Sequence, residues 1–260
     1  MSKVDQFESM FRAAARDMYA HEPVEIGSVL VITDLDEAGA RLFGEAVRRF
    51  LRVIDNAGTV RWRDVTGPEF STAGELLALV ESAGPDLICT YRNLHSSAWK
   101  WPYSLGTHLD LLTQHTGIPV MVLPHPKAGR GAGHAMENTN AVTAITDHLA
   151  GDQRLVNHAV SFTEPSGTLW LTHVEDEATF ERYMEAIGKI SSIDTDEASE
   201  AIRQRLLVAF GHHLSEYRRI IETLEVDLLV LNTRKEDQLA MHGMAYALAV
   251  ELRHIPLLML

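Results

Sequence analysis

Two aspartates stand directly after apolar, strand-like runs, which is where α/β proteins place groups that touch ligands. Asp34 follows Ile32-Thr33, and Asp147 follows Ile145-Thr146, so the same three-residue ending occurs twice. The carboxyl ends of parallel strands meet at one edge of a sheet, and ligands bind beyond that edge. We therefore take Asp34 and Asp147 as the first candidate binding residues.

A second set of candidate binding residues, polar side chains and glycines, follows two further apolar runs, at 86–90 and 227–231. After the first run these residues are Arg92, Asn93, Ser96, Ser97, Gly106 and Thr107; after the second they are Asn232, Thr233 and Gly243. A glycine and a hydroxyl residue that open a helix suit an anion, because the first backbone N–H groups of a helix point at it. The first loop could therefore hold a small anion. In the second loop Met244 stands where Thr107 stands in the first.

The two loops belong to a longer internal repeat. Residues 86–123 and 227–260 each read as strand, loop, helix and strand, and in each the glycine lies thirteen positions before a proline, Gly106 before Pro119 and Gly243 before Pro256. Such self-similarity indicates two similar α/β halves in one chain.

Hydrophobic periodicity places the remaining elements. We expect strands at 28–33, 59–65, 86–90 and 119–123, with helices after Asp34 to about 53, at 71–83 and at 104–116. In the second half we expect strands at 141–146 and 167–174, helices at 152–163, 177–190 and 196–224, and then the closing unit. Alternating strands and helices predict parallel sheets covered on both faces.

The same pattern divides the chain into four parts. We expect an N-terminal helical arm at 1–26, a first domain at 27–123, a Pro- and Gly-rich linker at 124–140 and a second domain at 141–260. The first domain is the shorter, and it lacks about one strand–helix unit between its opening aspartate and its closing unit.

Bulk composition excludes several classes of protein. A net charge of −13 over 260 residues argues against general nucleic-acid binding, which needs a basic face. No apolar run approaches the ~20 residues of a membrane span. The single cysteine, Cys89, cannot form an internal disulfide, and we expect a cytoplasmic protein.

The doubled layout resembles the universal stress proteins of the UspA type. The resemblance rests on an opening strand that ends in Asp and a closing unit of Asp-Leu-hydrophobic, loop, Gly-(Ser/Thr), helix and Pro-Val-hydrophobic, and it covers residues 27–123 and 141–260. It implies an adenine nucleotide alpha hydrolase-like α/β fold: two tandem doubly wound parallel sheets, the first copy abbreviated. It also implies that the last strands of the two domains associate, which would make an intrachain pseudo-dimer and leaves a further homodimer open.

Nucleotide-binding members of this family carry Gly-x2-Gly-x9-Gly-(Ser/Thr) around the phosphates, and their opening aspartate lies near the adenine and ribose. By resemblance Asp34 and Asp147 match that aspartate, and Gly106-Thr107 and Gly243 match the end of the loop motif. The first two glycines are absent from both copies, and residues 91–99 and 232–237 supply bulky or charged side chains instead.

Other chemistries are weaker matches. Asp34-Leu35-Asp36 is similar to a haloacid-dehalogenase nucleophile motif, but its later partners are missing, and acids at a helix start explain Asp36 and Glu37. The thirteen histidines, among them His95, His108, His115, His125, His134, His212 and His213, lack the spacing of a zinc enzyme. We read the glycine-rich run at 129–133 as linker and the aromatic run at 99–103 as filling space.

Two functions remain open. The favoured one is a stress-response or signalling module without catalysis, which binds a protein partner or small ligand and has weakened or lost ATP binding. The alternative is a protein that binds ATP or AMP in the first half, with slow ATP hydrolysis as a further option. Neither needs a metal, nucleic acid or membrane.

Overall fold

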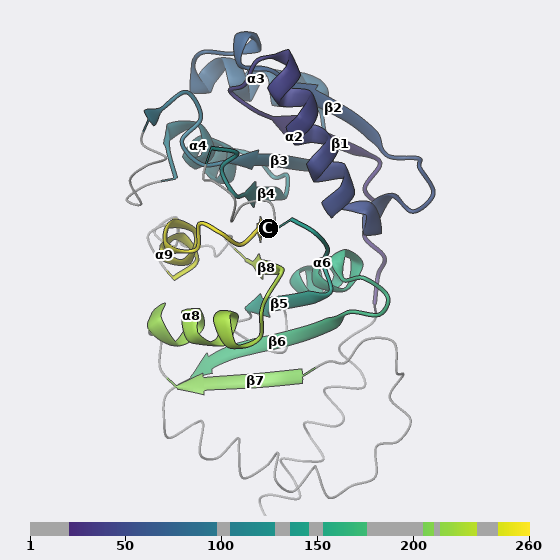
Figure 1. Ribbon diagram of the computed structural model, residues 1–260, viewed down its shortest axis with the longest axis vertical. Coiled ribbons are helices and arrows are strands. Elements are labelled where there is room, and N and C mark those ends of the chain that lie inside the picture. Colours follow the sequence, from purple (N-terminus) through teal and green to yellow (C-terminus); the bar gives the residue numbers. More distant parts are fainter. Residues whose placement is uncertain are drawn as a thin grey trace, which may run out of the picture.

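The computed structural model describes residues 21–97, 105–127, 136–145, 153–175, 205–210, 214–232 and 244–260. These residues form one nine-stranded sheet in the order β2-β1-β3-β4-β9-β8-β5-β6-β7, with helices packed against it (Figure 1). The strands are β1 (Ser28–Ile32), β2 (Arg61–Val65), β3 (Leu87–Tyr91), β4 (Val120–Leu123), β5 (Ala141–Ile145), β6 (Thr168–Glu175), β7 (Arg205–Phe210), β8 (Leu228–Leu231) and β9 (Leu257–Met259).

The helices alternate with the strands, as the sequence predicts. They are α2 (Glu37–Phe50), α3 (Ala73–Ala83), α4 (Thr107–His115), α6 (Gln153–Phe162), α8 (Leu214–Thr223) and α9 (Met244–Glu251), with short 3₁₀ helices at η1 (Arg52–Asp55) and η2 (Gly67–Glu69). The α/β class and the mostly parallel sheet are confirmed. Among the residues described, no helix is long and apolar enough to cross a membrane.

The sheet changes direction once, at its centre. Strands β4 and β9 pair antiparallel, with Val120 opposite Met259 and Val122 opposite Leu257, whereas every other pair of neighbouring strands is parallel. All residues of these two strands are buried. The C-terminus consequently lies in the middle of the molecule (Figure 1).

Local signals account for the helix ends of the first half. The Asp36 side chain accepts a hydrogen bond from the Gly39 backbone at 2.8 Å and caps α2, so the acids there serve the helix start as expected. Thr72 and Glu75 form a capping box at the start of α3. That helix ends at Gly84, whose φ of 52° is the left-handed conformation that glycine adopts readily.

One element of the second half was predicted wrongly. The sequence interpretation placed a helix at 196–224, but Arg205–Phe210 is a strand that pairs along its whole length with β6, and α8 starts only at Leu214. The run Leu206-Leu207-Val208-Ala209-Phe210 is apolar at every position, which is typical of a strand inside a covered sheet. The predicted helices at 5–20 and 177–190 lie outside the described residues.

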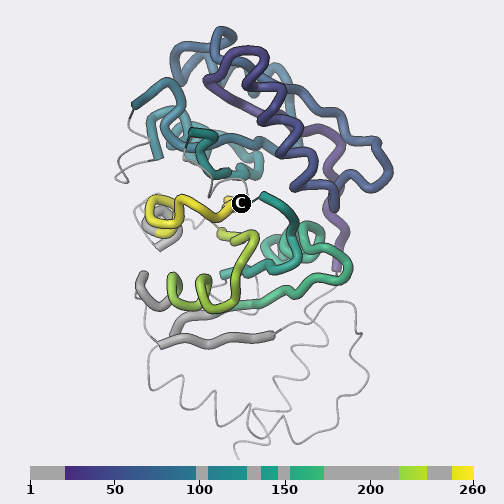
Figure 2. Tube along the Cα trace, in the orientation of Figure 1, coloured from purple at the N-terminus to yellow at the C-terminus, as the bar shows by residue number. Residues whose placement is uncertain are grey.

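The segment before β1 lies against the second half of the chain. The Glu22 backbone N–H donates to Asn157 Oδ1 at 3.2 Å, and that of Val24 donates to Ser161 Oγ at 3.4 Å. Both acceptors are on α6, and Figure 2 shows the start of the coloured trace running beside that helix. Residues 21–26 therefore link the second half to the first.

Candidate functional site

Asp34 lies at the carboxyl end of β1, where the sequence placed it, and both of its carboxylate oxygens bond to groups of the chain itself. Oδ1 accepts the hydroxyl hydrogen of Tyr91, and Oδ2 accepts the backbone N–H of His95 at 3.0 Å. The Asp34 backbone N–H in turn donates to the Tyr91 hydroxyl at 3.0 Å. A methyl group on Gly67 would lie 2.7 Å from the Asp34 carbonyl oxygen, so η2 passes directly over this turn.

Tyr91 ends β3 and is completely buried. Its ring packs edge-on against Phe43 at 5.3 Å and His125 at 4.7 Å between ring centroids. Burial, and then the Asp34 carboxylate, raise the pKa of Tyr91 well above its ordinary value. The hydroxyl therefore keeps its proton and can donate to Asp34 throughout the physiological pH range.

An imidazole cluster covers the same turn. The rings of His95 and His108 both pack edge-on against buried Phe70, at 4.7 and 5.6 Å, and lie 5.7 Å from each other. Burial, and then the neighbouring His95, lower the pKa of His108, while burial lowers the pKa of His125 to about 4. His108 and His125 are therefore neutral near pH 7. In the described part of the chain, no three His, Cys, Asp or Glu side chains group in a way that could hold a metal ion.

In the loop after β3, two residues other than glycine have left-handed backbone angles. Asn93 has a φ of 58° and His95 a φ of 54°, both left-handed conformations that cost side-chain-bearing residues energy. The Asn93 N–H donates to Leu105 O at 2.8 Å, and the Ser96 N–H donates to Asn93 O at 3.1 Å. Asn93 and Ser96 lie thirteen and ten residues before Gly106.

Gly106 begins α4 in close contact with this loop. Its φ is 90°, and a Cβ atom there would lie 2.9 Å from the Asn93 Cα. Only glycine satisfies both the angle and the contact. Asn93 and Gly106 are therefore in contact, and Ser96, Ser97 and Thr107 are exposed on the loop and at the helix start.

Arg92 points elsewhere. Its side chain is 8 % exposed, and its Nη2 donates to Leu252 O, at the end of α9, at 2.5 Å. Burial, and then the charge of Arg253, lower the pKa of Arg92 to about 10, so it remains a cation. A cation at the carboxyl end of a helix offsets the helix dipole. Arg92 therefore connects the first half to the second rather than joining the loop of Asn93 and Gly106.

The second candidate site is described only in part. Asn232 is exposed directly after β8, whereas Asp147, Thr233 and Gly243 lie outside the described residues. In the first half, sequence reasoning missed the bond between Tyr91 and Asp34 and the part played by Phe70. The available signal was the place of Tyr91 at the last position of a strand adjacent to β1.

The comparisons with known proteins identify the fold. A scan against protein-family models finds no match, and a search of curated proteins finds none either. Among solved structures, a universal stress protein from Archaeoglobus fulgidus DSM 4304 superimposes with a TM-score of 0.60 at 12 % identity, over 91 % of this chain and 98 % of that chain. A candidate universal stress protein from Pseudomonas aeruginosa UCBPP-PA14 gives 0.54 at 14 % identity, over 90 % and 93 %.

A third structure, a protein of unknown function from Pseudomonas aeruginosa PAO1, gives a TM-score of 0.53 at 16 % identity, over 90 % of this chain and 92 % of that chain. At these identities the likeness concerns the fold. The chain has the α/β fold of these proteins along nearly its whole length.

Proposed function

We propose that this chain, which has the fold of universal stress proteins, is a tandem member of that class that acts without catalysis and has closed its first nucleotide cleft with its own side chains. It would serve as a stress-response or signalling module for a protein partner or small ligand. The proposal places it in the cytoplasm, where a lone buried thiol such as Cys89 stays reduced.

The duplication is supported by hydrogen bonds that recur in both halves. The Asp86 N–H donates to Ser28 O at 3.0 Å, and the Asp227 N–H donates to Ala141 O at 2.8 Å. In each half the same aspartate side chain also accepts a backbone N–H at the start of the opening strand. These aspartates begin the repeated closing units.

The strand order supports the same reading. The first half contributes β2-β1-β3-β4 and the second contributes β7-β6-β5-β8-β9, so the two orders correspond when β7 is set aside. The closing strands correspond too: Ile88 N–H donates to Pro119 O and Leu229 N–H to Pro256 O, both at 3.0 Å. On this proposal the β4–β9 pair is the junction of an intrachain pseudo-dimer.

The observation that carries the loss of nucleotide binding is that both carboxylate oxygens of Asp34 already accept hydrogen bonds from the chain itself. A nucleotide that used the same lone pairs would have to displace the Tyr91 hydroxyl and the His95 N–H. Hydrogen bonds to a charged group are worth about 1.5–3 kcal/mol each when lost without replacement. The family loop also has side chains at Asn93 and Ser96, where phosphates would meet bare backbone.

Titration calorimetry tests the proposal. We expect ATP, AMP and cyclic AMP to show no saturable binding to the full chain below about 1 mM. The variant Tyr91→Phe frees Asp34 Oδ1 and keeps the ring, and His95→Gly removes an imidazole at a left-handed position. Micromolar ATP binding by the unmodified chain, lost in Asp34→Asn and Thr107→Ala, would refute the proposal.

One observation favours the alternative function, nucleotide binding in the first half. The loop backbone still adopts left-handed angles at Asn93, and Gly106-Thr107 opens α4 beside it. The alternative therefore predicts that ATP binds as tightly to the unmodified chain as to the double variant Asn93→Gly/Ser96→Gly. If only the double variant binds, side chains rather than backbone have removed the site.

A further inference from the structure

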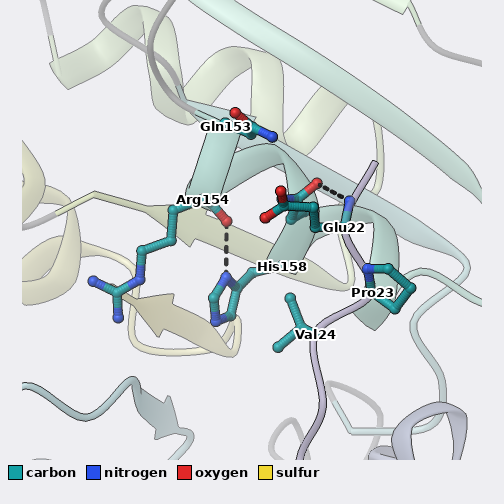
Figure 3. Close-up of a pocket in the computed structure, with 7 residues that line it drawn as sticks. Glu22, Pro23, Val24, Gln153, Arg154 and His158 are labelled. Atoms are coloured by element: carbon teal, nitrogen blue, oxygen red, sulfur yellow. Dashed lines mark hydrogen bonds between the residues drawn. The ribbon is translucent and has the colours of Figure 1, made fainter. Parts of the chain in front are cut away.

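A cavity of about 360 Å³ lies between the segment before β1 and the first turns of α6 (Figure 3). The backbone hydrogen bonds of Glu22 and Val24 to α6 hold this segment in place as one wall of the cavity. It is distinct from the turn of Asp34, and none of the residues that line it belongs to the candidate site described above. Its volume is at the lower end of the range for small-molecule sites, about 300–1,000 Å³.

His158 presents a hydrogen-bond acceptor in this cavity. Its side chain lines the cavity and is 8 % exposed, and its Nδ1 lies 2.8 Å from the Arg154 carbonyl oxygen. Because a carbonyl can only accept, Nδ1 carries the ring hydrogen and Nε2 has a free lone pair. Within the described residues Nε2 has no hydrogen-bond partner. Burial lowers the pKa of His158, so the ring is neutral near pH 7.

Opposite charges flank this acceptor. Glu22 and Arg154 both line the cavity, and Figure 3 shows them on opposite sides of His158. The Glu22 carboxylate has no bonding partner among the described residues, because the contact of Glu22 with α6 is made by its backbone. The cavity thus has an anionic end, a cationic end and an acceptor between them, with Val24 as an apolar contact.

We propose that this cavity binds a small dipolar molecule with one ammonium and one carboxylate group, of the size of a free α-amino acid. Its carboxylate would take the forked N–H groups of Arg154, a geometry that matches carboxylates. Its ammonium would donate to the Glu22 carboxylate and to His158 Nε2. A simple anion would be repelled by Glu22, and a simple amine by Arg154. The proposal is independent of the state of the first cleft.

The test titrates the full chain with L-alanine, and with acetate and methylammonium as the two half-ligands. We expect L-alanine to bind saturably with a Kd below about 1 mM and neither half-ligand to saturate at that concentration. The imidazole NMR signal of His158 should shift with the same Kd, which assigns the binding to this cavity.

Glu22→Gln and Arg154→Gln should each weaken L-alanine binding at least about tenfold, as loss of a charged hydrogen bond predicts. Both residues are exposed, so the variants should fold. Glu25→Gln is the matched control, because Glu25 is an exposed acid on the same segment outside the cavity, and it should leave the Kd unchanged.

Several results would overturn the proposal: no saturable L-alanine binding up to about 10 mM, acetate or methylammonium binding as tightly as L-alanine, or binding that leaves the His158 signal unmoved. A negative result in these titrations would not change the conclusion drawn from the ATP titration. A negative ATP titration would likewise not change the conclusion about this cavity.

Discussion

The hydroxyl of Tyr91 should be worth about 2 kcal/mol of unfolding free energy, and Tyr91→Phe removes it alone. The hydroxyl donates to the Asp34 carboxylate and accepts the Asp34 N–H. A bond to a charged group contributes about 1.5–3 kcal/mol and a neutral one about 0.5–1.5 kcal/mol. Because Asp34 is half-buried, water can replace part of this loss. The ring stays packed against Phe43 and His125, so no large cavity forms.

Urea unfolding followed by circular dichroism measures this quantity, and a double-mutant cycle with Asp34→Ala isolates the pair. We expect a coupling free energy between Tyr91→Phe and Asp34→Ala of at least about 1 kcal/mol. A coupling under about 0.5 kcal/mol would show that the pair contributes no more than an exposed contact. The argument that Asp34 is held by the chain itself would then be wrong.

Three further predictions concern the same region and the antiparallel pair of β4 and β9 at the centre of the sheet. The pKa of His125 is lowered to about 4, so between pH 6.5 and about 4 the unfolded chain binds more protons than the folded chain. The unfolding free energy should therefore fall as the pH drops through this window, by at most about 3 kcal/mol. In His125→Gln the urea midpoint should fall less steeply over the same pH range. Gly106→Ala should lower the unfolding free energy by about 2 kcal/mol or more, because both the φ of Gly106 and its contact with Asn93 exclude a side chain. Gly74 is the control: it lies in α3 with open space around it, and Gly74→Ala should raise the unfolding free energy by about 0.5–1 kcal/mol. Deletion of residues 256–260 should give insoluble protein on expression, because it removes β9 and exposes the edges of β4 and β8.

Each of these three has an outcome that contradicts it. The pH prediction fails if unmodified chain and His125→Gln lose stability in parallel. The glycine prediction fails if the two alanine variants change stability in the same direction. A soluble, cooperatively unfolding truncation would contradict the third.

Much of the fold could be predicted from the sequence because its strands are plainly patterned. The run Val29-Leu30-Val31-Ile32 is buried at every position, as a continuous apolar run rich in β-branched residues indicates. Strand β7 was missed because its five apolar residues, 206–210, have no turn signal in front of them and fit a helix as well as a strand. Its pairing with β6 decides between the two, and a long-range pairing leaves no local trace in the sequence.

The candidate site was harder to predict for a related reason. Asp34 and Gly106 could be found because strand ends and helix starts have local signals. The bond between Asp34 and Tyr91 joins the ends of two neighbouring strands, and the rings of His95 and His108 contact both Phe70 and each other. Such contacts depend on register and side-chain direction. Arg92 likewise reads as an anion ligand in sequence but turns to Leu252.

The pairing of β4 with β9 also limits the order in which the chain can fold during synthesis. Strand β4 finds its partner β9 only about 135 residues later in the chain. At a translation rate of roughly 5–20 residues per second, the inner edge of β4 is left uncovered for about 7 to 27 seconds after it leaves the ribosome. A nascent chain in that interval presents an apolar edge without a cover, and we expect it to be the stage at which a holdase chaperone binds.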